Sequence, residues 1–552
     1  MYTLPNSAEM ANIDIETQET YNISGLLLME NAARSLLEAL TKFVRDSGYT
    51  VQAVRIVFVA GPGNNGGDAL ALARMWLCLA GGSPRVLLST EPKSGTASAV
   101  HLETIERLGI PVLWDTIPHG ETARSELQAA EVIVDGVFGT GLRGGLRPEA
   151  AALLESINQA SACCVSIDIP SGISDDYQGD RVAVKAQLTL AVELPKLCYY
   201  TEAARPLCGA ICVVPLGFPP ALIQPELRGQ TAASAKSGQT GNTTSTRAVL
   251  LTAADLSRFI PDFDPYAHKY QRGALVVFAG SANFPGAAVL ACNAAQRTRA
   301  GYVYLASDPD ALRRMSALDP AVVAASAGSD TQALRAVDFH KFGAAVVGPG
   351  WGRDSTRVEQ LKQLLGVLPP GVLDADGLYV LEQVLREGSL AKVSPVAGWI
   401  LTPHHGEFER LGFGPVPKDA AARKTLLAEC SAELDSVVVL KGPVTWIMAP
   451  DGRCAVYDGA DPLLAAGGSG DVLCGCIGSF RAAGAEAFNA ACAGVLTLGA
   501  AALEARRRYG VFSPSDLPLE LGKVVARAKQ LQTASDGYSA RVRRLLRKGR
   551  NA

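Results

Sequence analysis

Short apolar runs alternate with amphipathic segments along the first part of the chain. Helical periodicity fits between some of the runs, at 69–79 and 149–159, and 13–43 is typical of two helices. Continuous apolar strands separated by helices indicate a parallel sheet covered on both faces, so a Rossmann-like α/β/α sandwich is predicted. The predicted strands are 54–61, 84–89, 132–139, 163–172, 188–196 and 211–217.

The same alternation returns later in the chain and predicts a second α/β/α sandwich. Between the two lies QTAASAKSGQTGNTTST, residues 230–246, which has no large apolar residue. Such a segment buries too little surface to offset its ordering entropy, so it is predicted to be a linker. The expected domains are therefore 1–229 and 247–552. The strands predicted in the second domain are 274–280, 301–307, 344–350, 371–377, 398–403 and 436–442.

Composition narrows the classes of partner. The 552 residues are 48% hydrophobic and 19% charged, which is typical of a soluble globular protein with large cores. A net charge of −3 argues against a general nucleic-acid surface. The most apolar stretch, 487–503, contains Asn489 and is rich in Ala and Gly, so a buried helix is favoured over a membrane span. We expect neither a nucleic acid nor a membrane as partner.

The cysteines and the N-terminal residues indicate in which cellular compartment the protein is expected. The 12 cysteines are scattered and form no CxxC pair, which favours reduced structural thiols over metal ligands. Residues 1–15 show no apolar segment behind a basic one, so they do not resemble a secretory signal. A cytoplasmic location is expected. The basic run 541–550 is interpreted as a solvated tail.

Three glycine-rich or polar loops follow strands of the first domain: GPGNNGGD (61–68), FGTGLRGG (138–145) and DIPSG (168–172). Ligands of open parallel sheets bind beyond the carboxyl ends of the strands. The first loop also leads into a helix, whose free N–H groups suit a phosphate. Tight turns are the alternative for any one of these loops. Three such loops on one sheet edge indicate a ligand site.

Two carboxylates, Asp135 and Asp168, each end an apolar strand. A buried carboxylate must be paired or functional, although bracing of a loop or helix end is an alternative role. With Asn65 and Ser171, Asp135 would offer hard oxygen ligands to a small cation. The chemistry alone does not name the ion.

GPGNNGGD, VDGVFGTGL and DIPSG, in this order and followed by Leu194-Pro195-Lys196, resemble the NAD(P)H-hydrate epimerase family over about residues 1–225. The resemblance implies a potassium ion between Asn65, Asp135 and Ser171. It also implies that Asp168 faces the reacting ring, where we expect it to carry the proton. Ala69 stands where the family often has Gly, and its methyl group is expected to crowd the substrate slightly. The implied substrate contacts are Asn64, Asn65, Gly66, Gly67, Asp68, Gly139, Thr140, Gly141, Leu142, Arg143, Gly144, Gly145 and Asp168.

In the second domain, GGSGD (467–471) runs from a flexible turn into a helix. The N–H groups of 468–470 would form an anion hole for a transferring phosphoryl group, and Asp471 could take a proton from a hydroxyl. A plain helix cap is the alternative for Asp471. KGPVT (441–445) ends a strand and could contact nucleotide phosphate, or its lysine is simply solvated.

These motifs, with GSANFPGAA (280–288), GPGWG (348–352), LDADGL (373–378) and LTPHHGEF (401–408), resemble the ribokinase-like ADP-dependent NAD(P)H-hydrate dehydratases over about 250–530. The resemblance implies that the hydrated nucleotide contacts Ala287, Gly352, His404 and Asp471. It implies that the adenine nucleotide binds Lys441, Gly442, Pro443, Val444, Thr445 and Gly470. The departures are His405 for Pro, Ser469 for Thr, Gly377 for Ala and Tyr270 for Gly. His404 and His405 are adjacent, but no acidic or Cys partner has metal-ligand spacing.

The resemblances together predict repair of hydrated nicotinamide nucleotides, NADHX and NADPHX. The first domain would interconvert the R and S epimers. The second would phosphorylate the ring hydroxyl of the S epimer and eliminate phosphate, using ADP or ATP with Mg²⁺. The alternative is a vitamin-pathway kinase of the ribokinase superfamily fused to a non-catalytic nucleotide-binding or scaffolding domain. The choice of nucleotide and of hydrate stays open, as does assembly into a homo-oligomer.

Overall fold

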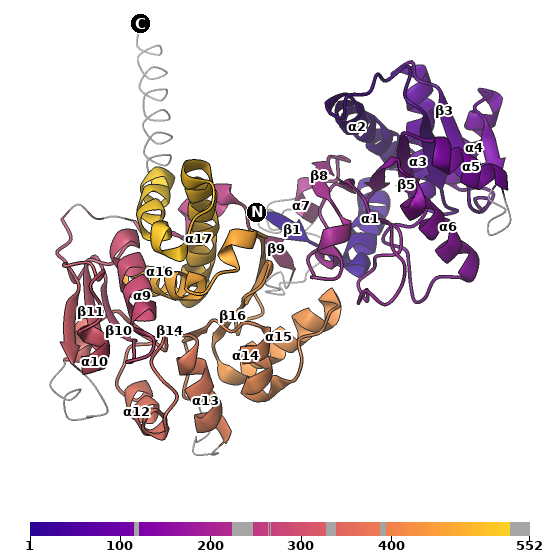
Figure 1. Cartoon of the computed structure of the whole chain (residues 1–552). Helices are drawn as coiled ribbons and strands as arrows, with labels where there is room; N and C mark the ends of the chain where they lie inside the picture. Colours follow the sequence, from indigo (N-terminus) through magenta and orange to yellow (C-terminus); the bar gives the residue numbers. More distant parts are fainter. Residues whose placement is uncertain are drawn as a thin grey trace, which may run out of the picture. The chain divides into compact units, whose positions relative to one another are not determined.

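The computed structural model describes residues 1–114, 121–223, 247–262, 264, 266–326, 338–386 and 394–529 (Figure 1). The chain forms two compact units. The N-terminal unit holds Tyr2–Ala248 together with Pro417–Lys424, and the C-terminal unit holds the rest. The predicted linker, 230–246, and the predicted basic tail, 541–550, lie outside the described residues.

The N-terminal unit is built on a parallel sheet of seven strands in the order β4-β3-β2-β5-β6-β7-β8. The order reverses between β2 and β5, which makes this the switch point where doubly wound sheets bind ligands. The predicted parallel sheet is confirmed. Its strands are β2 (Ile56–Ala60), β3 (Pro84–Leu88), β4 (Val112–Trp114), β5 (Val132–Gly136), β6 (Cys163–Ile167), β7 (Leu188–Val192) and β8 (Ala210–Val214).

Helices cover both faces of this sheet. Successive strand residues point to opposite sides, and here the residues on both sides are apolar and belong to a buried cluster. In β2, Phe58 packs edge-on against Trp76 of α3 (Asn64–Cys78) in one apolar cluster, whereas Val57 and Val59 belong to the opposite cluster. The sandwich is therefore confirmed. Its elements besides the sheet are β1 (Tyr2–Leu4), α1 (Ser7–Tyr21), α2 (Gly25–Asp46), α3 (Asn64–Cys78), α4 (Ala97–Arg107), α5 (Glu121–Ala129), α6 (Pro148–Gln159), η1 (Leu197–Tyr199), η2 (Arg205–Leu207) and α7 (Pro220–Ile223).

The sheet of the C-terminal unit runs in the order β9-β18-β17-β16-β15-β14-β13-β10-β11-β12. It is mixed rather than purely parallel, because β17 is antiparallel to both β16 and β18. The connections to β17 are too short for a crossover, which is why these strands form hairpins. The strands are β9 (Ala248–Leu250), β10 (Ala274–Phe278), β11 (Tyr302–Ser307), β12 (Val323–Ser326), β13 (Ala344–Val347), β14 (Val372–Leu373), β15 (Ile400–Leu401), β16 (Val437–Leu440), β17 (Val444–Met448) and β18 (Cys454–Asp458).

A tightly packed layer on this sheet is formed by three helices, α9 (Pro285–Thr298), α16 (Ser469–Ala482) and α17 (Ala487–Tyr509). Gly475 of α16 allows the closest approach, since a Cβ there would lie 2.0 Å from the Ala291 carbonyl oxygen of α9. Among the described residues, α17 alone has the length and hydropathy of a membrane span, and 67% of its most apolar window is buried inside the protein. The prediction of a buried helix at 487–503 is confirmed.

The bounds of the remaining elements complete the C-terminal unit. They are η5 (Ala253–Asp255), α8 (Leu256–Phe259), α9 (Pro285–Thr298), α10 (Pro309–Leu312), η6 (Phe339–Lys341), α12 (Ser355–Leu365), α13 (Asp376–Arg386), α14 (His405–Phe408), η7 (Glu409–Phe413), α15 (Ala420–Leu434), η8 (Pro462–Leu464), α16 (Ser469–Ala482), α17 (Ala487–Tyr509) and η9 (Pro514–Asp516). All 12 cysteines are free thiols and most are buried, as the sequence predicted.

Candidate functional sites

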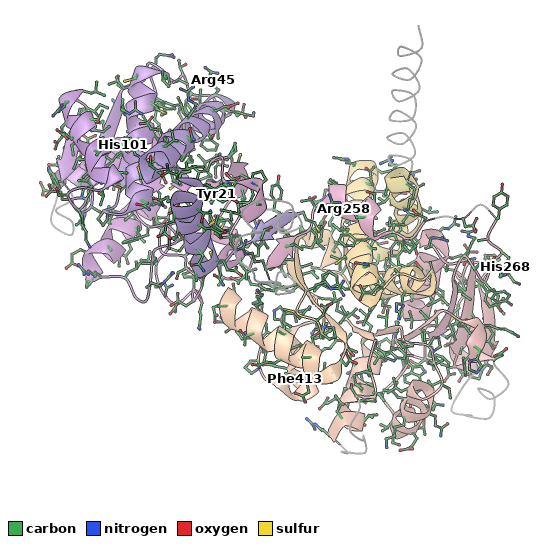
Figure 2. All side chains as sticks on the ribbon, turned by 180° about the vertical axis from the view of Figure 1, so that it is seen from behind. Tyr21, Arg45, His101, Arg258, His268 and Phe413 are labelled. Atoms are coloured by element: carbon green, nitrogen blue, oxygen red, sulfur yellow. The ribbon has the colours of Figure 1, made fainter. Side chains whose placement is uncertain are left out.

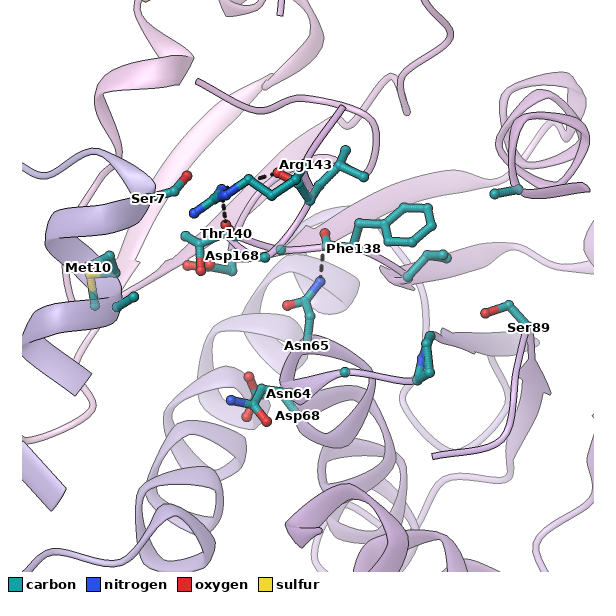
Figure 3. Close-up of a pocket in the computed structure, with 18 of the residues that line it drawn as sticks. Ser7, Met10, Asn64, Asn65, Asp68, Ser89, Phe138, Thr140, Arg143 and Asp168 are labelled. Carbon is teal, nitrogen blue, oxygen red and sulfur yellow. Dashed lines mark hydrogen bonds between the residues drawn. The ribbon is translucent and has the colours of Figure 1, made fainter. Parts of the chain in front are cut away.

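A cavity of about 1060 Å³ opens beyond the carboxyl ends of β2, β5, β6 and β7 (Figure 3). The three predicted loops meet there. Of the predicted substrate contacts, Gly66, Gly67 and Gly144 do not line it. Those that line it are Asn64, Asn65, Asp68, Gly139, Thr140, Gly141, Leu142, Arg143, Gly145 and Asp168.

Close backbone packing explains the glycines of the first loop. A Cβ on Gly66 would lie 1.8 Å from the Gly61 carbonyl oxygen, and one on Gly61 would lie 1.9 Å from that of Val137. Ala69 lies deeper, fully buried, with its methyl group toward the backbone of Gly136. The expectation that Ala69 crowds the substrate is therefore wrong, because this methyl group packs against β5 and does not line the cavity.

Asp135 at the end of β5 is fully buried and accepts four hydrogen bonds. The hydroxyl and amide of Ser171 donate to it at 2.6 and 2.9 Å, and the Ser166 hydroxyl at 2.8 Å. The Val137 amide adds a fourth bond at 3.2 Å. Burial raises the pKa of Asp135, and these hydrogen bonds oppose the rise.

The side chain of Asn65 leaves an oxygen without a partner. Its amide nitrogen donates to the Phe138 carbonyl at 3.0 Å, while its Oδ1 is buried with no hydrogen bond (Figure 3). An orphaned buried oxygen is costly unless a ligand satisfies it. Together with the buried charge of Asp135, this oxygen fits a bound cation.

Asp168 follows β6 and is held by two residues that come after β7. Lys196 is 1% exposed, and its ammonium group bonds the Asp168 carboxylate and the Val192 carbonyl. The Tyr199 hydroxyl donates to the Asp168 carbonyl. Asp168 itself has a φ of 63°, a left-handed conformation that is uncommon for a non-glycine residue and recurs at functional sites. Lys196 belonged to the family pattern in the sequence but was not among the predicted site residues.

In the C-terminal unit, the predicted substrate and nucleotide motifs follow β10, β13, β15 and β16. Together with β14, these strands are adjacent and parallel, so their carboxyl ends share one edge of the sheet. The GPGWG loop rests on the loop before α9, where a Cβ on Gly350 would lie 2.6 Å from the Phe284 carbonyl oxygen and 3.0 Å from the Ala287 methyl. Gly352 donates its amide to Asp376 at 2.9 Å.

Lys441 is ion-paired rather than solvated. Its ammonium group lies 2.6 Å from Asp374 and 3.7 Å from Glu407, and Thr402 donates to Asp374 at 2.8 Å. Burial lowers the pKa of Lys441, but the negative charges of Asp374 and Glu407 prevail and raise it. Asp374 and Glu407 lie in quoted motifs, yet neither was among the predicted site residues. The signal was present for Asp374, which ends an apolar strand as Asp135 does.

The glycine-rich turn enters α16 as predicted. Gly468 has a φ of 107° and occupies the N-cap position, where no side chain caps the helix. Asp471 is the third residue of α16 and does not occupy the cap position, contrary to the cap alternative. Burial and the charges of Asp374 and Asp376 raise the pKa of Asp471 to about 7, against the opposing effect of Lys441.

A second cavity, of about 560 Å³, lies beside this turn. It is lined by His404, Lys441, Gly442, Pro443, Thr445 and Gly470, all of them predicted site residues. Val444 is 1% exposed and points into the core, because β17 side chains alternate. Ala287, Gly352 and Asp471 do not line this cavity.

Of the two adjacent histidines, His404 has a structural role at the start of α14. His404 caps α14, with its Nδ1 accepting from the Glu407 amide at 3.2 Å and its own amide donating to the Glu407 carboxylate at 2.9 Å. Within the described ranges, no group of three or more His, Cys, Asp or Glu side chains could hold a metal ion. A potassium site made of Asn, Asp and Ser oxygens is a different kind of site.

Comparison with known proteins covers both units. A family described as NAD(P)H-hydrate dehydratase matches residues 275–527, and one described as YjeF-related protein N-terminus matches 25–198. The ADP/ATP-dependent NAD(P)H-hydrate dehydratase of Bacillus subtilis, solved with ATP and Mg²⁺, is 27% identical. It matches 51% of this chain and 98% of its own, with a TM-score of 0.43.

Full-length relatives combine both parts. The bifunctional NAD(P)H-hydrate repair enzyme Nnr of Moorella thermoacetica is 30% identical over 522 residues, covering 92% of this chain and 93% of the relative. The corresponding enzyme of Salinibacter ruber is 32% identical over 526 residues and covers 91% of each chain. With the two sites on two α/β units, these similarities show that the chain belongs to the family of bifunctional NAD(P)H-hydrate repair enzymes.

Proposed function

We propose that this chain repairs hydrated nicotinamide nucleotides in two reactions. The N-terminal unit interconverts R- and S-NAD(P)HX, and the C-terminal unit dehydrates S-NAD(P)HX to NAD(P)H at the expense of ADP or ATP. The observation that carries the proposal is the presence of both loop constellations in a chain whose full-length relatives are bifunctional repair enzymes. A kinase with a non-catalytic partner domain would not need the Asn65, Asp135, Asp168 and Ser171 set.

For the epimerase, the cavity beyond β2 and β5 is proposed to bind the hydrated dinucleotide, with Asp168 at the reacting ring. Potassium is proposed to be held by Asn65, Asp135 and Ser171. The orphaned Oδ1 of Asn65 and the buried charge of Asp135 support a cation there. When bound, the cation supplies positive charge that offsets the buried carboxylate.

For the dehydratase, Ala287, Gly352, His404 and Asp471 are proposed to contact the hydrate, and residues 441–445 with Gly470 the adenine nucleotide. Asp471 takes the proton of the ring hydroxyl as that oxygen forms a bond to the terminal phosphorus and the bond to the nucleotide breaks. The phosphate then leaves with the ring oxygen while C5 loses a proton and the C5=C6 double bond forms, because phosphate is a better leaving group than hydroxide. Mg²⁺ on the nucleotide neutralises phosphate charge when bound.

The test of both reactions uses the purified full-length chain. Each epimer of NADHX and NADPHX is incubated with and without ADP or ATP, while the absorbance of reduced nicotinamide is followed. We expect the S epimer to be dehydrated only with nucleotide, and the R epimer to follow through epimerisation. Absence of nucleotide-dependent dehydration of the S epimer would contradict the dehydratase, and a persistent R epimer would contradict the epimerase.

The potassium proposal has its own test. In Asp135→Ala the buried charge and the anchor of Ser171 are lost, so the potassium dependence of epimerisation should disappear while dehydration of the S epimer is retained. Epimerase rates are measured across potassium concentrations for both proteins, with thermal unfolding as a folding control. An unchanged potassium dependence would contradict the binding of potassium by Asp135 and its neighbours.

We also propose a cytoplasmic location, which the free, mostly buried cysteines support. Assembly into a homo-oligomer is also proposed, and light scattering of the purified chain measures it. A mass equal to that of a single 57.7 kDa chain would contradict it.

A further inference from the structure

A second carboxylate faces Asp168 across the epimerase cavity. Asp68 is the fifth residue of α3 and lies next to Asn64 (Figure 3), and it lines both the main cavity and a smaller one of about 470 Å³. Asp14 of α1 lines the same two cavities. Within the described part of the chain, the carboxyl oxygens of Asp68 have no hydrogen-bond partner, so they are free to meet a ligand.

The charges around Asp68 are mostly negative. Burial raises the pKa of Asp68 well above its usual range, and the carboxylates of Asp168 and Asp14 raise it further. Lys196 opposes this, but its ammonium group is bonded to Asp168 and Val192. Burial also raises the pKa of Asp14, against a hydrogen bond from Gln18 at 3.1 Å.

Other charged groups near α3 are engaged elsewhere. Arg74 binds Glu30 of α2 at 2.6 Å, and His101 of α4, which lies inside the N-terminal unit (Figure 2), is 3.9 Å from the same carboxylate. Arg143 in the cavity wall donates to the carbonyls of Thr140 and Leu142 in its own loop. None of these cations compensates Asp68, so the carboxyl groups of Asp68 and Asp168 have different environments. Asp168 is paired with a lysine, and Asp68 is not.

We propose that Asp68 is the general acid of the epimerisation and Asp168, held by Lys196, is its base partner. This inference rests on the epimerase function proposed above. The neutral carboxyl of Asp68 donates its proton to the C6 hydroxyl as the C6–O bond breaks and water leaves. The ring nitrogen supplies the electron pair that forms C6=N. Water then attacks the opposite face of C6, its proton passes to Asp168, and the nitrogen regains its electron pair. One proton enters and one leaves, so the exchange is balanced without an oxidant or reductant.

Two carboxyl groups in different environments are a common way to divide acid and base roles. Asp14 acts through Asp68, since its negative charge favours the protonated form. It is therefore a positioning residue in this scheme, and removal of its charge should change the pH dependence. Because the acid must be protonated, activity is lost as pH rises through the pKa of Asp68. A lower pKa moves that loss to lower pH.

The experiment measures epimerase kcat and KM against pH in the full-length chain. Asp68→Asn is nearly isosteric and should lower kcat by about 100- to 10,000-fold, with a much smaller change in KM. Asp14→Asn should move the alkaline limb of the kcat profile to lower pH. Glu19→Gln, an exposed change on the same helix, is the matched control and should leave the limb in place.

Folding is monitored by thermal unfolding. Asp68 has a folded-state pKa above its unfolded value of about 3.9, so its ionisation destabilises the folded state as pH rises above that value. Asp68→Asn should therefore unfold at or above the wild-type temperature at neutral pH. A folded Asp68→Asn protein with near-wild-type kcat would overturn the inference, as would an unmoved alkaline limb in Asp14→Asn. A wild-type chain that fails to interconvert epimers would instead overturn the proposed function, and the inference with it.

Discussion

At the scale of single residues, the position of Asp471 within its helix distinguishes a role as general base from a role as helix cap. It is the third residue of α16, behind Gly468 at the cap position. Asp471→Asn should lower nucleotide-dependent dehydration by about 100- to 10,000-fold, because the amide cannot accept the proton. Nucleotide binding and epimerisation should be retained. Turnover and thermal stability are measured together, and near-normal turnover would exclude Asp471 as the base.

The raised pKa of Asp471 predicts the pH dependence of the same reaction. A base must be ionised, so activity should appear as pH rises through about 7 and fall about tenfold per unit below it. The kcat/KM for S-NADHX at saturating nucleotide is measured between about pH 5 and 9, roughly two pH units on each side of the pKa of Asp471. An acidic limb near the usual aspartate value of about 4 would contradict the assignment.

Strand-end carboxylates were the most informative residues in the sequence. Asp135, Asp168 and Asp374 each lie at or directly after the end of an apolar strand, and each has hydrogen-bond or ion-pair partners in the folded protein. Their partners were harder to predict. Lys196 and Lys441 reach Asp168 and Asp374 from segments that follow other strands, and sequence spacing does not show which side chains will meet.

At the scale of elements, glycine placement determines how α16 begins. An alanine at Gly468 would need a φ of 107° and would place its Cβ 2.6 Å from Leu290. The left-handed conformation alone costs an L-residue about 1–2 kcal/mol. Gly468→Ala should therefore lower the unfolding temperature of the C-terminal unit and weaken nucleotide binding.

Gly467→Ala is the matched control for this prediction. No atom lies within 4 Å of a Cβ at Gly467, and its backbone is not left-handed. Its unfolding temperature should stay near that of the wild type. Calorimetry with and without ADP distinguishes the two variants, and equal stability of both would contradict the strained-turn explanation.

Element prediction succeeded where burial on both sides makes a strand uniformly apolar. Every predicted strand is present, including the two-residue strands β14 and β15. The strand β17 was not predicted, and neither was its antiparallel direction, because an apolar run has the same composition in either direction. Only the short connections and the pairing with β16 and β18 determine it.

At the scale of the whole molecule, the linker composition predicts that the two halves act separately. A chain ending at residue 229 should interconvert epimers without nucleotide. Pro417–Lys424 belongs to the N-terminal unit in the structure and is missing from such a chain, so reduced stability is expected. Epimerase activity of the truncated and full-length chains is compared. A folded truncated chain without activity would contradict independence.

The sequence by itself determined the two α/β units, the loops that line the two cavities and most residues of both candidate sites. These features are local, since a strand, its following glycine turn and the helix start are contiguous in the chain. The tertiary structure alone decided which side chains meet: Asp14 and Asp68 at one cavity, Lys196 beneath Asp168, and Lys441 between Asp374 and Glu407. The reason is that charge environments depend on distances between elements, and these distances arise only when the sheets and helices pack.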